Sequence, residues 1–330
     1  MSRIAVLGAG AWGTALTISL ARRGGHQLVL WSYSAELAEQ MTETGENLQF
    51  LPGYTVPADV RVTSDLVGSV FEADIVLCVT PSEHMRGVFG QIAPVLTRDQ
   101  IVVSATKGLE ESSLLRMSQV IASLTNNPVG VLSGPSFAAE VASGIPTAIV
   151  AASSVPGVAQ TIQKEFSSST LRLYTNDDVA GVELGGALKN VIALAAGVVN
   201  GLDLGYNSGA ALITRGIAEM TRLAVACGGR RQTLAGLSGI GDLVLTCTGS
   251  LSRNRTVGTE LGKGRSLPEI LEGLHGKVAE GIRSTTAALG LAARYGVEMP
   301  ITEQMDAILH HGKSPKDAIR DLMARPGRDE

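Results

Sequence analysis

The sequence predicts an α/β fold whose N-terminal part is a doubly wound, mostly parallel sheet and whose C-terminal part is an all-α domain. Short β-branched runs alternate with helix-like stretches through the first half, which is typical of parallel strands joined by covering helices. A glycine-rich turn directly follows the first run, and beyond Asp177 the β-rich runs stop. We therefore expect two domains, over residues 1–182 and 183–330.

Seven short apolar runs are expected to form the sheet. They are 4–7, 28–31, 74–79, 101–105, 129–132, 147–151 and 171–174. Between them, 12–23, 82–96 and 112–124 carry apolar residues at mixed spacings of three and four, which predicts helices. This alternation indicates crossover connections, which place helices on the faces of the sheet.

From residue 182 onward the apolar spacing is helical. The predicted helices are 184–199, 208–227, 256–262, 267–274, 284–295, 301–310 and 314–323. Ser314-Pro315 places a proline at the first helical position after an N-cap, and Gly228-Gly229 ends the longest helix. The second domain is therefore expected to consist of helices.

The composition is that of a compact globular protein and excludes several functional classes. Hydrophobic residues make up 45% of the chain and charged residues 18%, which excludes intrinsic disorder. The formal net charge of -4 leaves no broad basic field, so no nucleic-acid partner is expected. The three cysteines and five histidines show no metal-ligand spacing, so we expect neither a metal site nor a disulfide framework.

The apolar runs also bear on the cellular location. No uncharged run approaches the ~20 residues of a membrane helix, and the first apolar run is too short for a signal-peptide core. We therefore expect a cytoplasmic protein without a membrane span. The sequence does not fix the oligomeric state, and a homodimer is compatible with it.

The turn at residues 8–13 reads Gly-Ala-Gly-Ala-Trp-Gly and lies between a predicted strand and a predicted helix. In this context the spacing is typical of a Rossmann-type dinucleotide-binding turn. Gly8 allows the tight turn, Gly10 lets the backbone approach a pyrophosphate, and Gly13 lets the helix pack on the strand. The anion would lie at the helix N-terminus, where N–H groups and the helix dipole favour negative charge. We therefore predict NAD or NADP as the cofactor.

The sequence leaves the choice between NAD and NADP open. An NAD site often has an acidic residue at the end of the second strand, where this chain has Trp31-Ser32-Tyr33-Ser34. No arginine for a 2′-phosphate stands there either. Glu36 lies slightly later and is expected to begin the next helix, where an acid complements the dipole.

Two lysines are candidates for catalysis. Lys107 follows the run 101–105, at the carboxyl edge of the sheet where open α/β folds bind ligands, although a solvated loop lysine has the same pattern. Lys189 and Asn190 interrupt an otherwise apolar helix. A lysine in that setting loses hydration, which disfavours its charged form and suits it to proton transfer. The alternative is a side chain whose stem covers the core while its ammonium reaches water.

Three further segments carry polar groups that could surround a substrate. The turn 133–138 offers backbone donors and a hydroxyl at the same sheet edge as Lys107, unless it is turn chemistry alone. Asp242 and Thr246 share a face if their segment is helical; a buried Asp242 would need a lysine partner, and the alternative is an N-cap. Ser252-Arg253-Asn254-Arg255 combines an N-cap hydroxyl with guanidinium groups, which is typical of a phosphate site.

Ten segments of the chain resemble the bacterial-type NAD(P)-dependent glycerol-3-phosphate dehydrogenase family, in order over nearly the whole length. They are GAGAWGTAL (8–16), NLQFLPG (47–53), ATKGLE (105–110), SGPSFAAE (133–140), GGALKNVIALAAG (185–197), ALITRGIAEM (211–220), GIGDLVLTC (239–247), SRNR (252–255), VAEG (278–281) and GVEMPIT (296–302). The resemblance implies a Rossmann-type domain joined to a helical domain, with the site in the cleft between them. The chain departs from the family at Ser32-Tyr33, where relatives often carry a basic residue.

The resemblance also implies a role for each candidate residue. Lys189 would be the general acid/base, Lys107 would contact substrate and cofactor, and Asn190, Asp242 and Thr246 would complete the catalytic surroundings. The substrate would be bound by Lys107, Gly134, Ser136, Lys189, Asp242, Ser252, Arg253 and Asn254. The cofactor would be bound by Gly8, Gly10, Ala11, Trp12, Gly13, Tyr33, Lys107, Ala138, Arg253, Val278 and Glu280.

The implied activity is reversible hydride transfer between NAD(P)H and dihydroxyacetone phosphate, giving sn-glycerol 3-phosphate for phospholipid synthesis. Two alternatives stay open at this point. A β-hydroxyacid dehydrogenase shares the two-domain plan but carries its lysine and asparagine in a Lys-x-x-x-Asn spacing, whereas Lys189 and Asn190 of this chain are adjacent. A nicotinamide-nucleotide sensor without turnover would keep the glycine-rich turn, which by itself indicates only binding.

Overall fold

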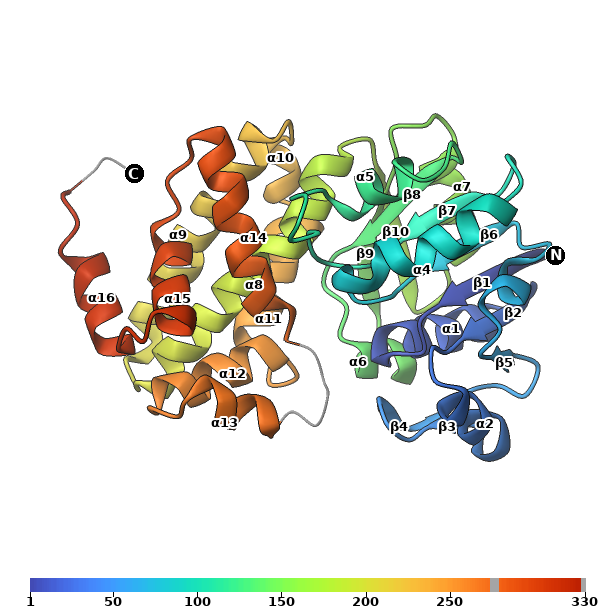
Figure 1. Ribbon diagram of the computed structural model, residues 1–330, viewed down its shortest axis with the longest axis horizontal. Coiled ribbons are helices and arrows are strands. Elements are labelled where there is room, and N and C mark those ends of the chain that lie inside the picture. Colours follow the sequence, from blue (N-terminus) through green and yellow to red (C-terminus); the bar gives the residue numbers. More distant parts are fainter. Residues whose placement is uncertain (274–278, 328–330) are drawn as a thin grey trace. The chain divides into compact units, whose positions relative to one another are not determined.

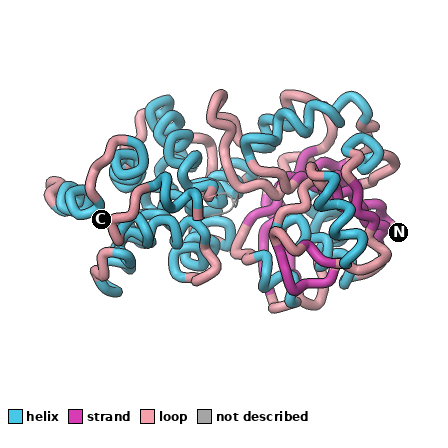
Figure 2. The backbone as a smooth tube through the Cα atoms, turned by 60° about the horizontal axis from the view of Figure 1, so that its bottom comes forward, coloured by secondary structure: helices cyan, strands magenta, loops and turns pink. Residues whose placement is uncertain are grey.

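The structure is a computed structural model that describes residues 1–273 and 279–327. The chain forms two compact units, one made of Met1–Glu110 with Leu115–Glu183 and the other of Glu111–Leu114 with Leu184–Glu330. The first unit is an α/β structure and the second is built from helices (Figures 1 and 2). The predicted fold class is therefore confirmed.

The main sheet of the first unit has eight strands in the order β10-β9-β8-β7-β6-β1-β2-β5. Their bounds are β1 Ser2–Leu7, β2 His26–Trp31, β5 Arg61–Thr63, β6 Ile75–Cys78, β7 Ile101–Ser104, β8 Val129–Ser133, β9 Thr147–Ala152 and β10 Leu171–Asn176. Neighbouring strands are parallel except for β8 and β9, which pair antiparallel. Seven of these strands were predicted; β5, with three residues, is too short to show a pattern.

Helices cover both faces of this sheet (Figure 1). They are α1 Ala11–Arg23, α2 Ala35–Thr44, α3 Leu66–Val70, α4 Met85–Ile92, α5 Met117–Ala122, α6 Ala138–Ser143 and α7 Val158–Phe166. Alternate residues of β1 enter two separate cores: Ile4 and Val6 pack with α1 and α7, while Ala5 and Leu7 pack with α4 and α5. This division is what a doubly wound sheet requires.

Two predicted helices of the first unit differ from the structure. The segment 82–96 is α4 flanked by 3₁₀ turns, Ser82–His84 and Ala93–Val95. The segment 112–124 becomes helical only at Met117, because Leu114 has a φ of +61°, which a helix does not accept. The helices α3 and α7 and the hairpin of β3 Glu46–Asn47 and β4 Leu51–Thr55 were not predicted, whereas α2 begins beside Glu36, as expected.

The second unit contains one long apolar helix, whose residues 181–198 are all buried. Its helices are α8 Val179–Gly201, α9 Gly205–Ala226, α10 Arg231–Leu234, α11 Asp242–Thr248, α12 Arg253–Gly262, α13 Leu267–Glu272, α14 Glu280–Tyr295, α15 Pro300–His310 and α16 Pro315–Met323, with a π-helical turn over Leu237–Gly241 before α11. The seven predicted helices are present, with their starts and ends shifted by up to five residues, and residue 274 of one of them lies outside the described residues. Among the described helices, α10 and α11 were not predicted.

The helices α8 and α12 touch through their backbones. A Cβ added to Gly258 would lie 1.9 Å from the carbonyl oxygen of Leu194, and one added to Gly197 would lie 2.1 Å from that of Arg255. Only glycine permits so close an approach. The contact fixes where α12 begins relative to the middle of α8, and this placement matters for the polar groups described below.

Within the described residues, α8 is long and apolar enough to cross a membrane, and a bent pair over Arg231–Thr248 and Arg253–Gly262 passes the same test when it is counted as one span. However, 89% of the most apolar stretch of α8 is buried inside the protein. The core helix of a globular domain has the same length and composition, so this is weak evidence for a span.

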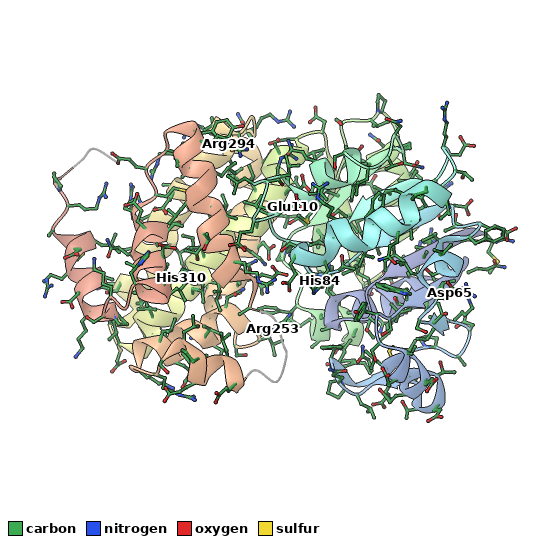
Figure 3. All side chains as sticks on the ribbon, in the orientation of Figure 1. Asp65, His84, Glu110, Arg253, Arg294 and His310 are labelled. Atoms are coloured by element: carbon green, nitrogen blue, oxygen red, sulfur yellow. The ribbon has the colours of Figure 1, made fainter. Side chains whose placement is uncertain are left out.

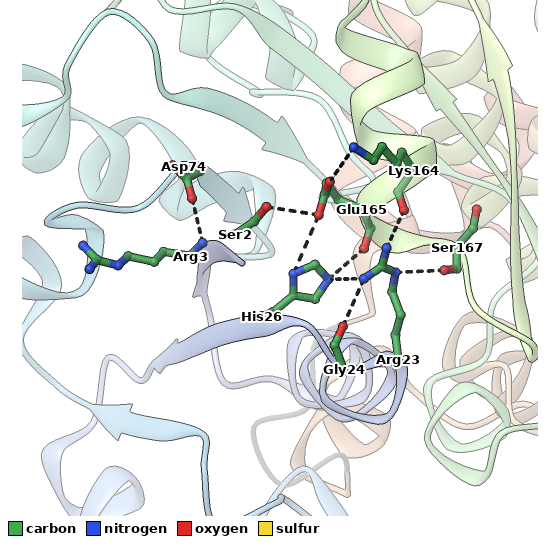
Figure 4. A network of polar contacts seen from close by, with 9 residues as sticks. All are labelled: Ser2, Arg3, Arg23, Gly24, His26, Asp74, Lys164, Glu165 and Ser167. Atoms are coloured by element: carbon green, nitrogen blue, oxygen red, sulfur yellow. Dashed lines mark hydrogen bonds and ion pairs between the residues drawn. The ribbon is translucent and has the colours of Figure 1, made fainter.

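A buried histidine holds β2 to α7 at the amino-terminal edge of the sheet (Figure 4). His26 Nε2 lies 2.9 Å from the carbonyl oxygen of Glu165 and 3.1 Å from the guanidinium of Arg23. Burial lowers the pKa of His26, and the Arg23 charge lowers it further, while the carbonyl and carboxylate of Glu165 act in the opposite direction. The folded protein therefore favours the neutral ring.

This arrangement predicts a loss of stability in mild acid. Because the pKa of His26 is lower in the folded chain, the unfolded chain takes up the proton first as the pH falls below 6.5. The stabilisation is fully present above pH 6.5 and is lost as the pH falls toward the folded pKa. We expect the melting temperature of His26→Gln to fall less over this range than that of the wild type, by on the order of a few degrees. The matched control is His84→Gln, because His84 (Figure 3) is exposed. If the melting temperature of His26→Gln falls with pH as much as that of the wild type, His26 is not the group responsible for the loss of stability.

The contact between α8 and α12 gives a second prediction. Gly258→Ala should destabilise the protein by about 1–3 kcal/mol, because the new methyl group meets the Leu194 carbonyl. The matched control is Gly209→Ala in α9, where nothing lies within 4 Å of the added Cβ. That change should stabilise by about 0.5–1 kcal/mol, through helix propensity alone. Denaturant unfolding of both variants measures the difference, and equal effects would contradict the close contact.

Candidate active site

The glycine-rich turn after β1 has the shape that an anion-binding turn needs. Gly8 has a φ of +125° and lies against the Val79 carbonyl, and a Cβ on Gly13 would lie 1.9 Å from the Gly8 oxygen. Both positions therefore require glycine. Gly10, by contrast, has no atom within 4 Å of an added Cβ, and as the N-cap of α1 it provides no capping side chain. The first N–H groups of α1 thus receive no side-chain cap.

Two neighbours of this turn strengthen the fit to a dinucleotide. The indole N–H of Trp12 is buried and makes no hydrogen bond within the described part of the chain, so it is a donor that a ligand could satisfy. Ala138 begins α6 and packs with Ala11 and Trp12 on the same core cluster. These residues fit the pyrophosphate and the adjoining part of a nicotinamide dinucleotide.

The end of β2 differs from both standard patterns of ribose recognition. Ser32 is 2% exposed and its N–H donates to Thr63, while Tyr33 is 89% exposed, with its ring edge-on to Trp31 at 6.4 Å. Glu36 lies in the first turn of α2, as expected, where it accepts a hydrogen bond from the N-cap Ser34. Tyr33 therefore offers an exposed aromatic ring just after the end of β2.

Lys107 is held against the turn that follows β8. Its Nζ donates to the carbonyl oxygen of Gly134 at 2.8 Å and lies 3.4 Å from the hydroxyl of Ser136, which itself donates to Gly134. Both segments follow parallel neighbouring strands, so their ends meet at the carboxyl edge of the sheet. The structure therefore brings Lys107, Gly134 and Ser136 together.

Lys189 lies in a buried polar centre of the second unit. Its Nζ donates to a carboxylate oxygen of Asp242 and, at 2.9 Å, to the hydroxyl of Thr246. Lys189 is 7% exposed and Asp242 0%. Asp242 lies in the first turn of α11, after the N-cap Gly241, so it is the lysine partner predicted from the sequence and not an N-cap. An ammonium held by two acceptors from one helix has a fixed direction.

The π-helical turn before α11 brings Asp242 within hydrogen-bonding distance of Lys189. A Cβ on Gly185 of α8 would lie 2.3 Å from the carbonyl oxygen of Ser238 in that turn. The absence of a side chain at Gly185 thus allows the turn to rest on α8, one helical turn before Lys189. Asp242, the first residue of α11, then meets the lysine.

The start of α12 forms a second polar group beside this centre. Ser252 caps the helix by accepting from the N–H of Arg255, and Arg253 occupies the first helical position (Figure 3). Burial lowers the pKa of Arg253, whereas the carboxylate of Glu280 acts to raise it. A partly dehydrated guanidinium at a helix N-terminus is suited to a phosphate.

Asn254 connects the two polar groups. Its Nδ2 donates to the Asn190 amide oxygen at 3.0 Å, and its Oδ1 accepts from the N–H of Gly281 at 2.9 Å. The amide of Asn190 therefore meets Asn254 and joins α8 to α12 next to Lys189. Glu280 begins α14 in the same region. Val278, which the resemblance assigns to the cofactor, lies outside the described residues.

Other chemistries find little support in the described residues. No group of three or more His, Cys, Asp or Glu side chains in that part of the chain is arranged to hold a metal ion. Burial raises the pKa of Cys247, beside Thr246, to about 12, and that of Cys78 likewise to about 12. Neither thiol is ionised near neutral pH, so neither is a nucleophile there.

Sequence reasoning missed one residue at the cofactor turn. Asn47 is fully buried and its amide donates to the carbonyl oxygen of Ala9, within the glycine-rich turn. The signal available was its position at the head of the segment 47–53, which matched the family but had been given no role. Because the contact spans 38 residues, no local pattern reveals it.

Comparison with known proteins gives a consistent picture. The models for the N-terminus and the C-terminus of NAD-dependent glycerol-3-phosphate dehydrogenase match residues 3–159 and 178–320. The chain is 62% identical to the glycerol-3-phosphate dehydrogenase [NAD(P)+] of Acidobacterium capsulatum, with full coverage of both chains, and 59% identical to that of Koribacter versatilis, covering 100% of this chain and 99% of the other. Its structure is similar to the crystal structure of glycerol-3-phosphate dehydrogenase from Coxiella burnetii, with a TM-score of 0.94 and 40% identity over 98% of this chain and 99% of that one.

Proposed function

Because the chain belongs to the NAD-dependent glycerol-3-phosphate dehydrogenase family, we propose that it transfers a hydride reversibly between NAD(P)H and dihydroxyacetone phosphate. The product of reduction is sn-glycerol 3-phosphate, the backbone precursor of phospholipids. The protein is an NAD(P)-dependent oxidoreductase that acts on a CH–OH group.

The observation that carries this proposal is the pairing of a proton-transfer centre with an anion site in one rigid cluster. Lys189 is held by Asp242 and Thr246, and the start of α12 with Arg253 is tied to the same stretch of α8 through Asn190 and Asn254. A ketone next to a phosphate requires these two features at a fixed separation. A protein that only sensed the cofactor would have no use for them.

In the reductive direction, Lys189 transfers a proton from Nζ to the carbonyl oxygen of the substrate as negative charge develops there. A bound nicotinamide would supply the hydride that the carbonyl carbon accepts. Asp242 and Thr246 keep the ammonium pointing in one direction, so little reorganisation is needed during the reaction. Lys189 then regains its proton from solvent, and the oxidative direction uses the same group as a base.

The other candidate residues take supporting roles in this proposal. Lys107, Gly134 and Ser136 contact the substrate, and Lys107 also contacts the cofactor. Ser252, Arg253 and Asn254 bind the phosphate. The cofactor is bound by Gly8, Gly10, Ala11, Trp12, Gly13, Tyr33, Ala138, Arg253, Val278 and Glu280. Residues 1–182 thus form the dinucleotide-binding domain and 183–330 the substrate-binding domain.

We propose that both NAD and NADP serve as cofactors. Ser32 and Tyr33, at the end of β2, carry no acid to bind a ribose 2′-OH, and Glu36 accepts a hydrogen bond from Ser34. The two arginines at the end of α1 are also engaged: Arg22 donates to carbonyl oxygens of α6, and Arg23 joins the His26 cluster. Tyr33 can stack on the adenine of either cofactor.

Two features of the cellular setting are also proposals. The cysteines are free thiols, which suits the reducing cytoplasm. A homodimer is the assembly we propose, and size-exclusion chromatography with light scattering tests it. Turnover itself is tested by mixing the purified protein with NADPH and dihydroxyacetone phosphate and following the nicotinamide absorbance.

The role of Lys189 predicts the behaviour of two variants. Lys189→Met alone leaves the Asp242 carboxylate buried without its partner, which costs about 3–5 kcal/mol of stability. Combining it with Asp242→Asn removes that charge. We expect the double variant to fold and to bind NADPH, with kcat lower by about 100- to 10000-fold. Turnover within a few-fold of wild type would remove Lys189 from the proton-transfer role.

The role of Arg253 predicts an effect on substrate binding. Arg253→Ala should raise KM for dihydroxyacetone phosphate by about 10- to 100-fold, since a charge-assisted contact is worth about 1.5–3 kcal/mol. The matched control is Arg255→Ala, two residues along the same helix, whose guanidinium donates to Asn200. The Arg253 variant should lose much less with a ketone that lacks the phosphate. Equal losses with both ketones would mean that Arg253 does not bind phosphate.

A further inference from the structure

Asn47 is a buried amide whose hydrogen bonds converge on the cofactor turn. It ends β3, in the hairpin with β4, and is 0% exposed. Its Nδ2 donates to the carbonyl oxygen of Ala9 at 2.8 Å and to the hydroxyl of Thr14 at 2.9 Å, and its Oδ1 accepts from the N–H of Phe50 at 3.0 Å. The side chain is therefore satisfied as donor and as acceptor.

The two acceptors lie on either side of Gly10, the residue with open space around its missing Cβ. Ala9 precedes Gly10 in the turn, and Thr14 lies in α1, where its own N–H donates to the Gly10 carbonyl at 3.0 Å. One amide group thus joins the peptide before Gly10 to the helix after it. The turn is also held by the N–H of Gly8, which donates to the carbonyl oxygen of Trp31 in β2.

Only an amide suits this position. A carboxylate of the same shape would place negative charge against the Ala9 carbonyl and would lose both donated hydrogen bonds. A small side chain would leave the Ala9 carbonyl unsatisfied in the core, at a cost of about 1–3 kcal/mol. The turn would then relax away from the arrangement that presents its N–H groups to an anion.

We propose that Asn47 is a positioning residue for the cofactor: it holds the Ala9–Gly10 peptide and the start of α1 in the arrangement that receives the pyrophosphate of NAD(P)H. This inference rests on the proposed function. It assigns a role to a residue of the hairpin β3–β4, which also packs on the core through Leu51 and Tyr54. Asn47 touches neither the reacting atoms nor the nicotinamide in this role.

The chain contains a closely matched control in Gln100. Gln100 is also a buried amide, 5% exposed, and its Nε2 donates to the carbonyl oxygens of Val70 and Ala73 while its Oε1 accepts from the N–H of Thr97. It precedes β7 and therefore lies at the amino-terminal edge of the sheet, whereas the cofactor turn follows β1 at the carboxyl edge. Gln100→Glu removes the same kinds of hydrogen bond without touching the turn.

The experiment compares Asn47→Asp with Gln100→Glu in the full-length protein. We expect both changes to lower the melting temperature. Asn47→Asp should also raise Kd for NADPH, measured by fluorescence titration, by about tenfold or more, while Gln100→Glu should leave it within twofold of wild type. At saturating NADPH, the Asn47 variant should keep its KM for dihydroxyacetone phosphate, since the substrate groups lie elsewhere.

Hydrogen exchange of the protein without cofactor gives a second readout. Amides 9–14 should exchange faster in Asn47→Asp than in wild type and at the wild-type rate in Gln100→Glu. If Asn47→Asp does not fold, Asn47→Ser takes its place under the same criteria. An Asn47 variant that folds, binds NADPH within twofold of wild type and leaves exchange of 9–14 unchanged would overturn the inference.

The proposed function is judged separately on the wild-type protein. Wild type that binds NADPH but does not reduce dihydroxyacetone phosphate would refute the proposed reaction. The Kd comparison would still decide the role of Asn47 in that case. Wild type that binds neither NADPH nor NADH would overturn both proposals.

Discussion

A buried ion pair, between Lys189 and Asp242, constrains how the segments of the second unit pack. Taking both charges out of water is costly, and their attraction offsets that cost only when the geometry is well fixed. The surroundings supply that geometry: Thr246 accepts a further hydrogen bond from the ammonium, and glycines at 185, 197 and 258 let the neighbouring segments approach α8 through their backbones. Close helix packing is therefore a condition for having a directed ammonium in the interior.

The two proposed anion sites, one in each unit, use different chemical groups. In the first unit, Gly10 before α1 has open space where a side chain would stand, and the side chain of Asn47 donates to the carbonyl oxygen of the neighbouring Ala9. In the second unit, the start of α12 adds the charged side chain of Arg253 to a capped helix N-terminus. In the proposed roles, a site built from backbone N–H groups accepts either dinucleotide, whereas the guanidinium of Arg253 adds a charge-assisted contact to the single phosphate of a small substrate.

Much of this could be predicted from the sequence, where the determinants are local. The alternation of strands and helices, the turn at 8–13 and the need of a buried Asp242 for a lysine partner all follow from short patterns, and the structure has them. The contacts that could not be predicted join distant segments. The left-handed Leu114, the π-helical turn before α11 and the amide of Asn47 make sense only with their partners in place, and no pattern of period two or 3.6 marks them.

The composition of α8 follows from the burial of Lys189 in the second unit. The helix around Lys189 and Asn190 consists almost entirely of Gly, Ala, Val, Ile and Leu, so the polar partners of these two residues come from α11 and α12. By length and hydropathy such a helix resembles a membrane span, yet its apolar surface faces protein. The two polar residues in its middle distinguish it from a membrane span better than its hydropathy does. An isolated lysine in lipid would have no carboxylate partner, whereas here Lys189 contacts Asp242 and Asn190 contacts Asn254. An apolar helix whose adjacent polar pair has buried partners is therefore better explained as the core helix of a domain than as a membrane span.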